Sequence, residues 1–532
     1  MPAAAPHVGR ETTDKHLARQ IEYIRDTSNS DVHDVIVRMK SPTLDDSTLL
    51  STLAEALRVR GLSVSARDLL PVSRGALESG LPSTKSARSR AADKRELNND
   101  KRSLAAQIAA TAPAALDLGI EVLRRTNFSA LAPLLASDLV RQSVAAIAAI
   151  PARRRPEPTE PTGFWTSTSA VIQVRDSDLS SLGAAVPDIE DILPNRRMFV
   201  PPVAVPKSLP GAVEDSKISS WGVRRIGALA AWGALGARGR GVKIGLLDTG
   251  VDASHPDLNG KITDWAEFDD KGREVAGSRP HDSDRHGTHC AGTILGGNAS
   301  GRWIGVAPEA EIAAALVLNG ALGGTDAQIL AGIDWAVNKG VDAISMSLGG
   351  FVLGPDVPPT YTKAILSALQ VGIPVIAAIG NEGSQTSGTP GSDFLAFAVG
   401  ATDPSDRAAG FSGGRTQIIR RSQLFPESML PLVYSKPDVS APGVAIYSSV
   451  PGGKWEHFNG TSMATPHVAG AIALLLSATR LQTVPAAQRA FVIQDLLTGS
   501  AEELGESGQN HRFGFGRIDI LRTIGFAQEK GY

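Results

Sequence analysis

The sequence predicts an α/β protein built on a mainly parallel sheet that is flanked by helices in three layers, with a smaller α+β domain before it. Residues 242–248 form a nearly continuous apolar run, which is typical of a strand buried on both faces of a parallel sheet. Similar runs alternate with helical patterns, as they do in α/β domains. The runs are 311–318, 343–348, 374–379 and 395–399, and the helical patterns are 326–339 and 360–371.

The smaller α+β domain is predicted at residues 31–205. Its expected elements follow one another as strand 34–40, helix 49–60, strand 169–174, helix 176–185 and a last strand within 189–199. Asp176 or Ser177 is the expected cap of the second helix. Strands and helices in this order indicate a small α+β unit.

A helical insertion at about 75–165 is expected to interrupt this domain. Its alanine-rich part, 103–150, is broken by Pro113 and Pro133, and a proline-rich charged linker follows. The insertion is interpreted either as a docking module for a protein partner or as a spacer. The other predicted segments are a polar extension at 1–30 with a short helix at 16–25, a linker and processing region at 206–220, and the main domain at 221–525.

Composition gives no sign of a special environment. Charged residues make up 20% of the chain and the net charge is −2, so neither nucleic acid nor an anionic membrane is an expected partner. One cysteine excludes an intrachain disulfide, and no apolar run is long enough to predict a membrane span. Because no apolar segment follows Met1, a cytoplasmic protein is expected, or a secreted one if a signal peptide was removed.

Four polar residues stand at the ends of strands or the starts of helices. Asp248 ends the first apolar run, His286 begins a His-Gly-Thr-His stretch, Asn381 follows another run, and Ser462 lies between a glycine turn and a helix. Each alone has an ordinary explanation: turn residues, a structural histidine and a helix cap. Sites in open α/β sheets lie beyond the carboxyl ends of strands, which favours a common site.

Together these four residue types match the needs of acyl transfer. A serine hydroxyl needs a base, histidine titrates near neutral pH, and a carboxylate fixes its tautomer. The oxyanion needs a positioned donor such as Asn381. A zinc pair formed by His286 and His289 is the alternative, but the glutamate of a His-Glu-x-x-His helix is absent.

Several longer motifs resemble those of subtilisin-like serine proteases, the subtilase family. The three signature segments correspond to Asp248-Thr-Gly-Val-Asp-Ala-Ser-His-Pro-Asp257, His286-Gly-Thr-His-Cys-Ala-Gly-Thr293 and Gly460-Thr-Ser-Met-Ala-Thr-Pro-His-Val-Ala-Gly470. Ala378-Ile-Gly-Asn-Glu-Gly383, Ser345-Met-Ser-Leu-Gly-Gly350, Asp438-Val-Ser-Ala-Pro-Gly443 and Phe513-Gly-Phe-Gly-Arg-Ile-Asp519 resemble further family landmarks. The resemblance covers about 220–525 and keeps the order Asp, His, Ser.

The resemblance implies a role for each site residue. Ser462 would be the nucleophile, His286 the base and Asp248 its orienting acid, while Asn381 and the Ser462 backbone N–H would form the oxyanion hole. Small pocket residues imply broad specificity that leans towards apolar or aromatic side chains, with Glu382 at the rim. The implied substrate-binding residues are Ser347, Leu348, Gly349, Gly323, Gly324, Ala378, Gly380 and Gly388.

The resemblance also implies that the α+β domain, which would be ferredoxin-like, is an inhibitory propeptide. In this family such a propeptide assists folding, inhibits the enzyme in the same chain and is removed by self-cleavage. The cut is expected between about 195 and 217, before a mature domain that starts near Trp221.

No cofactor is expected for the chemistry, and a structural calcium ion is an open possibility. Family members often bind calcium through the aspartate matched by Asp257 and a loop matched by 297–303. Asn298 stands one position early in that loop, which leaves Ala299 where an asparagine ligand is expected. Cys290 is interpreted as a buried inert residue rather than a reactive thiol.

Two functions are consistent with these residues. The first is a serine endopeptidase that acts on proteins or peptides and is made as a self-processing zymogen. The alternative is a catalytically silent, permanently inhibited protease fold that binds a partner. Retention of all four catalytic parts favours the first.

Overall fold

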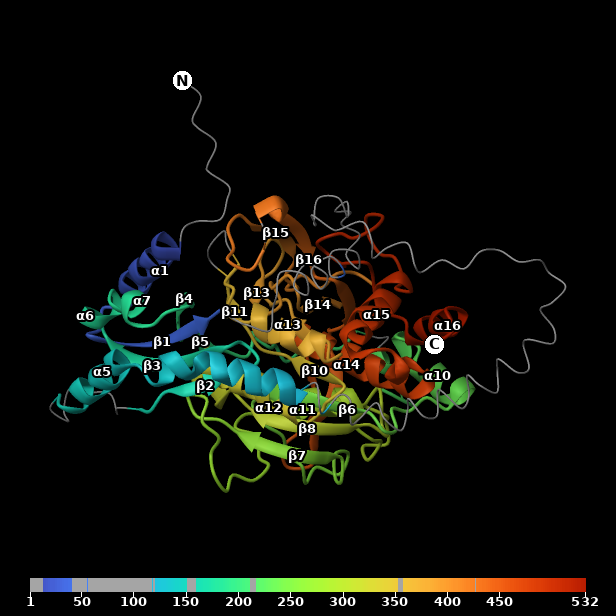
Figure 1. Ribbon diagram of the computed structural model, residues 1–532. Helices are drawn as coiled ribbons and strands as arrows, with labels where there is room; N and C mark the ends of the chain where they lie inside the picture. Colours follow the sequence, from blue (N-terminus) through green and yellow to red (C-terminus); the bar gives the residue numbers. More distant parts are fainter. Residues whose placement is uncertain are drawn as a thin grey trace, which may run out of the picture.

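The computed structural model describes residues 13–40, 120–150, 159–210, 217–352, 357–425 and 427–532, together with Glu55 and Asp117. Apart from Glu55, the predicted helix at 49–60 lies outside the described residues, as does Pro113. The N-terminal domain lies on the left of Figure 1 and the large α/β domain on the right.

A parallel sheet of seven strands forms the centre of the large domain, as predicted. Neighbouring residues of its central strand face opposite sides: Leu246 packs in one hydrophobic core and Leu247 in the other. This two-sided burial explains the continuous apolar runs. In sheet order the strands are β17 (Val439–Pro442), β14 (Phe397–Thr402), β12 (Val375–Ala378), β10 (Ala343–Met346), β6 (Lys243–Asp248), β8 (Glu311–Leu316) and β7 (Ile262–Glu267).

Helices cover both faces of this sheet and complete the three layers (Figure 1). One core contains α12 (Asp326–Asn338) and α13 (Thr362–Gln370), and the other contains α11 (His286–Leu295) and α14 (Thr461–Ala478). The remaining helices of the domain are α9 (Trp221–Arg225), α10 (Ala228–Leu235), α15 (Ala486–Gly499) and α16 (Ile520–Glu529).

One helix of the described chain, α14, is long and apolar enough by itself to cross a membrane, but 89% of that stretch is buried inside the protein. It is therefore the central helix of the large domain rather than a span. A bent pair, Ile120–Leu135 and α5 (Asp138–Ala148), passes the same test only if counted as one span.

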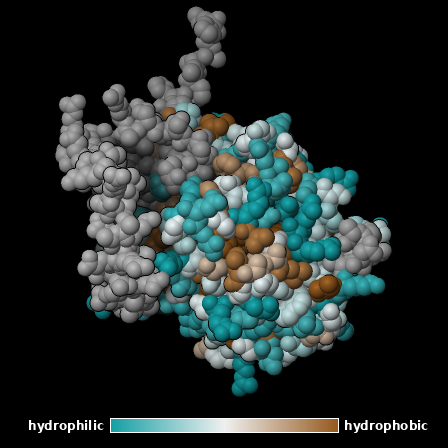
Figure 2. Space-filling view, turned by 90° about the vertical axis from the view of Figure 1, so that its right-hand side faces the viewer, coloured by the Kyte–Doolittle hydropathy of each residue, from teal (hydrophilic) through white to brown (hydrophobic). Residues whose placement is uncertain are grey.

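The face in Figure 2 is mostly hydrophilic around one apolar area.

The N-terminal domain has an antiparallel sheet in the order β2-β3-β1-β4, which is the ferredoxin-like order. The predicted strands are present as β1 (Val32–Met39), β3 (Ser169–Arg175) and β4 (Ile189–Pro194). β2 (Thr162–Phe164) was not predicted and falls in the range assigned to the insertion. It has only three residues, too few to give a readable period.

Three other expectations for this domain need correction. Residues 13–27 are not a mere polar extension, because α1 (Thr13–Thr27) buries Leu17, Ile21 and Ile24 in the core of the domain. The single helix expected at 176–185 is two short turns, α6 (Asp176–Leu179) and α7 (Leu182–Ala185), and neither has a side-chain cap.

The helical insertion bends later than its proline suggests. Pro133 lies within the last turn of Ile120–Leu135, and the chain turns at 136–137 before α5, with a bend of 60°. A proline removes one helical hydrogen bond and strains the turn before it, so the helix ends shortly after. Leu131, Leu134 and Val140 pack against the N-terminal sheet, and their burial fixes this arrangement.

Apolar and charged side chains both contribute to the contact between the two domains. Ile36 and Trp165 of the N-terminal domain share a hydrophobic core with the large domain, and charged pairs also cross the contact. Lys363 of the large domain is buried and pairs with Glu190, and Arg196 Nε lies 2.8 Å from the fully buried Asp326. Lys271 of the large domain also pairs with Asp34 of the N-terminal domain. Breaking one partner of a buried pair leaves an uncompensated charge, so these pairs fix how the domains dock.

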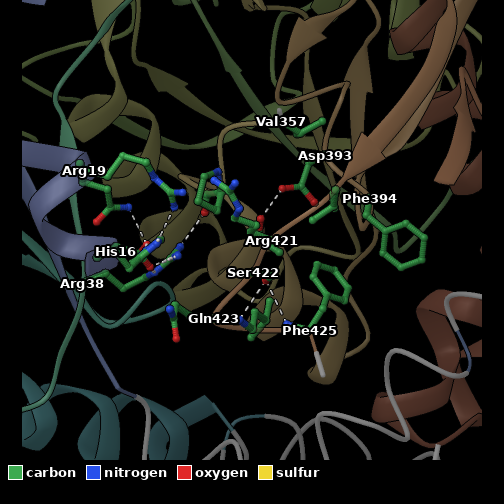
Figure 3. Close-up of a pocket in the computed structure, with 16 residues that line it drawn as sticks. His16, Arg19, Arg38, Val357, Asp393, Phe394, Arg421, Ser422, Gln423 and Phe425 are labelled. Atoms are coloured by element: carbon green, nitrogen blue, oxygen red, sulfur yellow. Dashed lines mark hydrogen bonds and ion pairs between the residues drawn. The ribbon is translucent and has the colours of Figure 1, made fainter. Parts of the chain in front are cut away.

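A cavity of about 250 Å³ lies in this contact (Figure 3). The N-terminal domain lines it with His16, Arg19 and Arg38, and the large domain with Phe394 and Arg421, among others. Arg38 is anchored here, because its Nε lies 2.9 Å from Asp191 Oδ2 and its Nη1 donates to Pro359 O at 2.6 Å. The walls of this cavity therefore combine charged side chains with apolar ones such as Phe394.

Three features of the large domain were not predicted. β7 is an edge strand with mostly half-exposed residues, so it lacks the apolar run of a central strand. A hairpin of β15 (Arg415–Ile419) and β16 (Leu432–Lys436) precedes β17, and its strands are separated by a long connection rather than a tight turn. A second hairpin joins β18 (Ile446–Val450) and β19 (Lys454–Phe458).

Candidate active site

Asp248 and His286 form a buried hydrogen-bonded pair at the carboxyl edge of the main sheet. Asp248 is the last residue of β6 and His286 the first of α11, and His286 Nδ1 lies 2.7 Å from Asp248 Oδ1. The carboxylate accepts the proton of Nδ1, which leaves Nε2 free to act as a base. Burial opposes a charged imidazole, but the Asp248 carboxylate raises the pKa of His286 well above its usual range.

Ser462 reaches the same edge from the first turn of α14. Its carbonyl accepts hydrogen bonds from Ser347 Oγ at 2.9 Å and from the thiol of Cys290 at 3.4 Å, and that thiol sulfur lies 3.9 Å from His286 Nδ1. The Ser462 hydroxyl donates to Ser347 O at 3.4 Å, while His286 Nε2 is buried without a partner in the described chain. In the part of the chain that the structure describes, the Ser462 hydroxyl and His286 Nε2 are therefore not hydrogen-bonded to each other.

Asn381 holds a backbone carbonyl at this edge. Its side-chain Nδ2 donates to Pro202 O at 2.9 Å. The Thr461 backbone N–H and Oγ1 both donate to Asn381 Oδ1 at 2.8 Å, which fixes the direction of the amide. Gly380 has a φ of 110°, so a left-handed turn that favours glycine precedes Asn381.

An extended segment of the N-terminal domain occupies the predicted substrate cleft. β5 (Arg197–Met198) pairs antiparallel with β9 (Gly324–Thr325) on one wall. On the other wall, Phe199 N donates to Gly349 O at 3.0 Å and Gly349 N donates to Phe199 O at 2.9 Å. Further along, Ala204 and Asn459 form an antiparallel bridge. The segment therefore runs as a strand between two sets of predicted substrate-binding residues, Gly323 and Gly324 on one wall and Ser347 to Gly349 on the other.

A pocket of about 260 Å³ lies beside this segment. It is lined by the predicted residues Leu348, Gly349, Ala378, Gly380 and Gly388, and also by Gly350, Phe351, Glu382 and Phe199 to Pro202. Ser347 and Gly324 do not line it, and Gly323 instead meets the segment, where an added Cβ would lie 2.2 Å from Met198 O. Gly349 thus belongs both to a wall and to the pocket, whereas Gly323 and Gly324 contact only the segment.

A family model described as the subtilase family matches residues 239–516, which is more than half of the chain. The chain belongs to the subtilase family. It is 38% identical to subtilisin DY from Bacillus licheniformis over 54% of the chain and 92% of that protein. It is 38% identical to subtilisin E from Bacillus subtilis (strain 168), over 58% of the chain and 72% of that protein.

Another relative is an intracellular serine protease from Paenibacillus polymyxa, 40% identical over 48% of this chain and 72% of the relative. These relatives support the assignment of this subtilase as a serine endopeptidase that acts on proteins or peptides. Subtilases need no cofactor for catalysis.

The second histidine of the motif has a structural place in this subtilase. His289 Nε2 lies 3.0 Å from Ile446 O, and its ring stacks on Phe458 with centroids 4.3 Å apart. Burial and the neighbouring His286 lower the pKa of His289 to about 3. His289 is therefore a neutral packing residue, and the zinc pair considered above is not formed.

Asp248, His286 and Cys290 have ligand atoms within 4.8 Å of one another, but the set does not fit a metal site. The Cys290 thiol already donates to Ser462 O at 3.4 Å, and burial raises its pKa to about 11. The His286 nitrogen next to the carboxylate is already used by the 2.7 Å hydrogen bond. The buried, inert Cys290 of the sequence reading agrees with this environment.

The calcium candidates of this subtilase do not form a calcium site. Asp257 Oδ1 accepts the Ala299 N–H at 2.7 Å and Oδ2 accepts Trp455 Nε1 at 2.7 Å, while the Asn298 residue is exposed. Lys261 reaches into the same loop, and its Nζ donates to Leu295 O at 2.8 Å. Calcium needs six or more converging oxygens, and here neutral donors and an ammonium group surround the carboxylate instead.

The sequence reading missed two parts of this site. Pro202 falls within the processing range predicted at 195–217, but no partner was predicted for its carbonyl. Thr461 was seen only as a possible helix cap, but its two donors orient Asn381. Both roles depend on contacts between residues far apart in the chain.

Proposed function

We propose that this subtilase is a zymogen whose own N-terminal domain covers a catalytic triad of Asp248, His286 and Ser462. The observation that carries this proposal is the 2.9 Å hydrogen bond from Asn381 Nδ2 to Pro202 O, made by a segment that pairs with both cleft walls. A carbonyl held by an oriented amide donor at the edge of the triad has the place of a reacting carbonyl. The inhibitory propeptide would comprise the part of the predicted domain 31–205 that precedes the cut, together with α1, which shares its core.

The proposed chemistry follows from the positions of the three groups. His286 Nε2 takes the proton of Ser462 Oγ as the oxygen bonds to the carbonyl carbon of the substrate. Asn381 Nδ2 and the Ser462 backbone N–H stabilise the resulting oxyanion. When the peptide C–N bond breaks, His286 returns the proton to the leaving amine. Water then repeats the sequence on the acyl-enzyme, which releases the acid and restores Ser462.

The hydrogen bond from Asn381 supports one bond as the site of self-processing. Because Asn381 holds the carbonyl of Pro202, the bond presented to Ser462 joins Pro202 to Val203. This bond lies within the predicted processing range of 195–217. The Pro201–Pro202 bond has its carbonyl one residue away from Asn381, so it is not the bond presented.

Broad specificity with a leaning towards apolar or aromatic side chains fits the pocket. Gly349, Gly350, Gly380 and Gly388 leave space at its walls, and the pocket of about 260 Å³ accommodates a large side chain. Glu382 is exposed at the rim and its Oε2 accepts the Asn381 N–H at 2.9 Å. Because one oxygen of the Glu382 carboxylate already accepts a hydrogen bond, we do not expect it to impose a strict selection for basic side chains of the substrate.

A serine-directed fluorophosphonate tests the proposed activity. The processed wild-type protein is expected to be labelled at Ser462, and the Ser462→Ala variant is expected to remain unlabelled. If no label appears even after the cover has been cut away by an added protease, the active triad is refuted. That result would favour the alternative, a silent protease fold that binds a partner through its inserted helices.

A further inference from the structure

The first turn of α11, which begins with His286, has no cap from its own N-cap residue, Arg285. The first four N–H groups of a helix have no partner within the helix and need one elsewhere. In α11 these partners come from outside the helix: Thr249 Oγ1 accepts the Gly287 N–H at 2.9 Å, and Asp282 Oδ2 accepts the Thr288 N–H at 2.8 Å. Asp282 therefore caps the helix that carries the proposed base.

The same carboxylate is tied to the strand that carries Asp248. Asp282 Oδ1 accepts the hydroxyl of Thr249, the residue after Asp248, at 2.7 Å. Asp282 Oδ2 also accepts the Thr288 hydroxyl at 2.6 Å. The next residue, Ser283, reinforces the link, because its N–H and Oγ both donate to Thr249 O, at 2.9 and 2.8 Å.

We propose that Asp282 is a positioning residue that sets the spacing between Asp248 and His286. Asp282 Oδ1 accepts the Thr249 hydroxyl at the end of the strand, and Oδ2 accepts the Thr288 N–H in the helix. Thr249 Oγ1 in turn accepts the Gly287 N–H of the same helix, which completes a ring of hydrogen bonds. Asp282 makes no contact with the reacting atoms and acts only through these residues. This inference rests on the proposed function, since it concerns the alignment of the proposed acid and base.

Loss of Asp282 is expected to slow the chemical step rather than to weaken substrate binding. The pair Asp248–His286 needs its 2.7 Å hydrogen bond to fix the tautomer and to hold the imidazolium that forms. Misplacement of a catalytic group by about 1 Å can cost about 100-fold in rate. Asp282 does not line the substrate pocket or either cleft wall, so its loss is expected to lower kcat while KM stays close to that of the wild type.

The test compares processed wild type with Asp282→Ala and Asp282→Asn on a fluorogenic peptide across pH. Asp282→Ala is expected to lower kcat by roughly 10- to 100-fold. It is also expected to move the acid limb of the kcat profile to lower pH, because a looser contact with Asp248 raises the pKa of His286 less. Asp282→Asn keeps one acceptor but cannot accept the Thr288 N–H with its NH₂ group, so an intermediate kcat is expected.

Asp269→Ala is the matched control. Asp269 lies in the loop before Asp282 and also accepts backbone N–H groups, those of Lys271 and Arg273, but it has no bond to α11. Its loss is expected to leave kcat and the acid limb unchanged. If Asp282→Ala does not fold, Thr288→Val and Thr288→Ser replace it in the test. Thr288→Val removes the hydroxyl that donates to Asp282 and is expected to reproduce the loss of kcat. Thr288→Ser retains this hydroxyl and is expected to restore activity.

The outcomes separate this inference from the proposed function. A wild type with no Ser462-dependent hydrolysis overturns the proposed function. An active wild type whose Asp282→Ala variant keeps the wild-type kcat, or loses kcat without any move of the acid limb, overturns the positioning role alone. For Thr288, equal rates in the valine and serine variants overturn it in the same way.

Discussion

Asn381 Nδ2 lies 2.9 Å from Pro202 O, so the side chain expected to stabilise an oxyanion already holds a carbonyl of the same chain. Thr461 fixes this amide from behind with two donors at 2.8 Å. The donor is thus oriented before any reaction, which is the condition for effective electrostatic stabilisation. This relationship links the catalytic edge of the sheet to the covering segment.

Loss of the Asn381 amide should slow the chemical step. Asn381→Ala is expected to reduce kcat by about 10²- to 10³-fold, because one oxyanion donor typically contributes about 3–4 kcal/mol. Steady-state kinetics on a fluorogenic peptide measure this, and KM should change much less. A wild-type kcat in this variant would show that Asn381 does not bind the oxyanion.

The charge of Asp248 should set the acid limb of activity. The carboxylate raises the pKa of His286, and only the neutral imidazole acts as a base, so activity falls as pH drops below that raised pKa. Asp248→Asn is expected to lower kcat by about 10⁴-fold and to move the acid limb to lower pH. A limb that stays in place, measured from kcat between pH 5 and 10, would contradict this assignment.

The hold of the N-terminal domain should weaken as pH rises through 7. Asp334 of α12 accepts the N–H groups of Trp165 at 2.7 Å and Thr166 at 3.0 Å, and also the Thr166 hydroxyl. Burial raises the pKa of Asp334 to about 7, although these donors favour the ionised form. Once the domains separate, the carboxyl returns to an ordinary pKa of about 4.

Between about pH 4 and 7 the docked form therefore holds a proton that the separated form lacks, so docking is tightest at the lower pH and is lost as pH rises. Gel filtration of the cleaved complex at pH 5.5 and 8.5 measures the fraction that remains bound. Asp334→Asn, which has no ionisable carboxyl, is the control and should flatten the difference. Tighter binding at pH 8.5 in the wild type would be incompatible with this account.

Gly292 and Gly233 form a matched pair for stability. Both lie within helices, where Gly to Ala typically gains up to about 1 kcal/mol. An added Cβ at Gly292 would lie 2.1 Å from Ser449 Oγ, whereas nothing lies within 4 Å at Gly233. Gly292→Ala is expected to destabilise the protein by about 1–3 kcal/mol and Gly233→Ala to stabilise it slightly, as measured by thermal unfolding. Equal shifts in melting temperature would contradict the close packing of α11.

The sequence predicted the central strands and the four site residues because their signals are local. A strand buried on both faces needs a continuous apolar run, as around Leu246 and Leu247, and the chemistry of Ser462 and His286 is carried by contiguous motifs. The edge strand β7 has no such run, because its residues are mostly half exposed.

Roles that depend on distant contacts could not be predicted. Asp282 and Thr249 are 33 residues apart, and Asn381 and Pro202 are 179 apart. Nothing in the neighbourhood of Pro202 signals that its carbonyl meets an amide of the other domain. The calcium candidates illustrate the same limit, since Lys261 and Trp455 enter that loop from other parts of the chain.

The most direct test of the central claim is the N-terminal sequence of the mature protein formed by incubated wild-type chain, with Ser462→Ala as control. We predict a new N-terminus at Val203 in the wild type and an intact chain in Ser462→Ala. A wild type that remains uncut, or a Ser462→Ala variant that is cut at the same bond, would contradict self-processing by this triad.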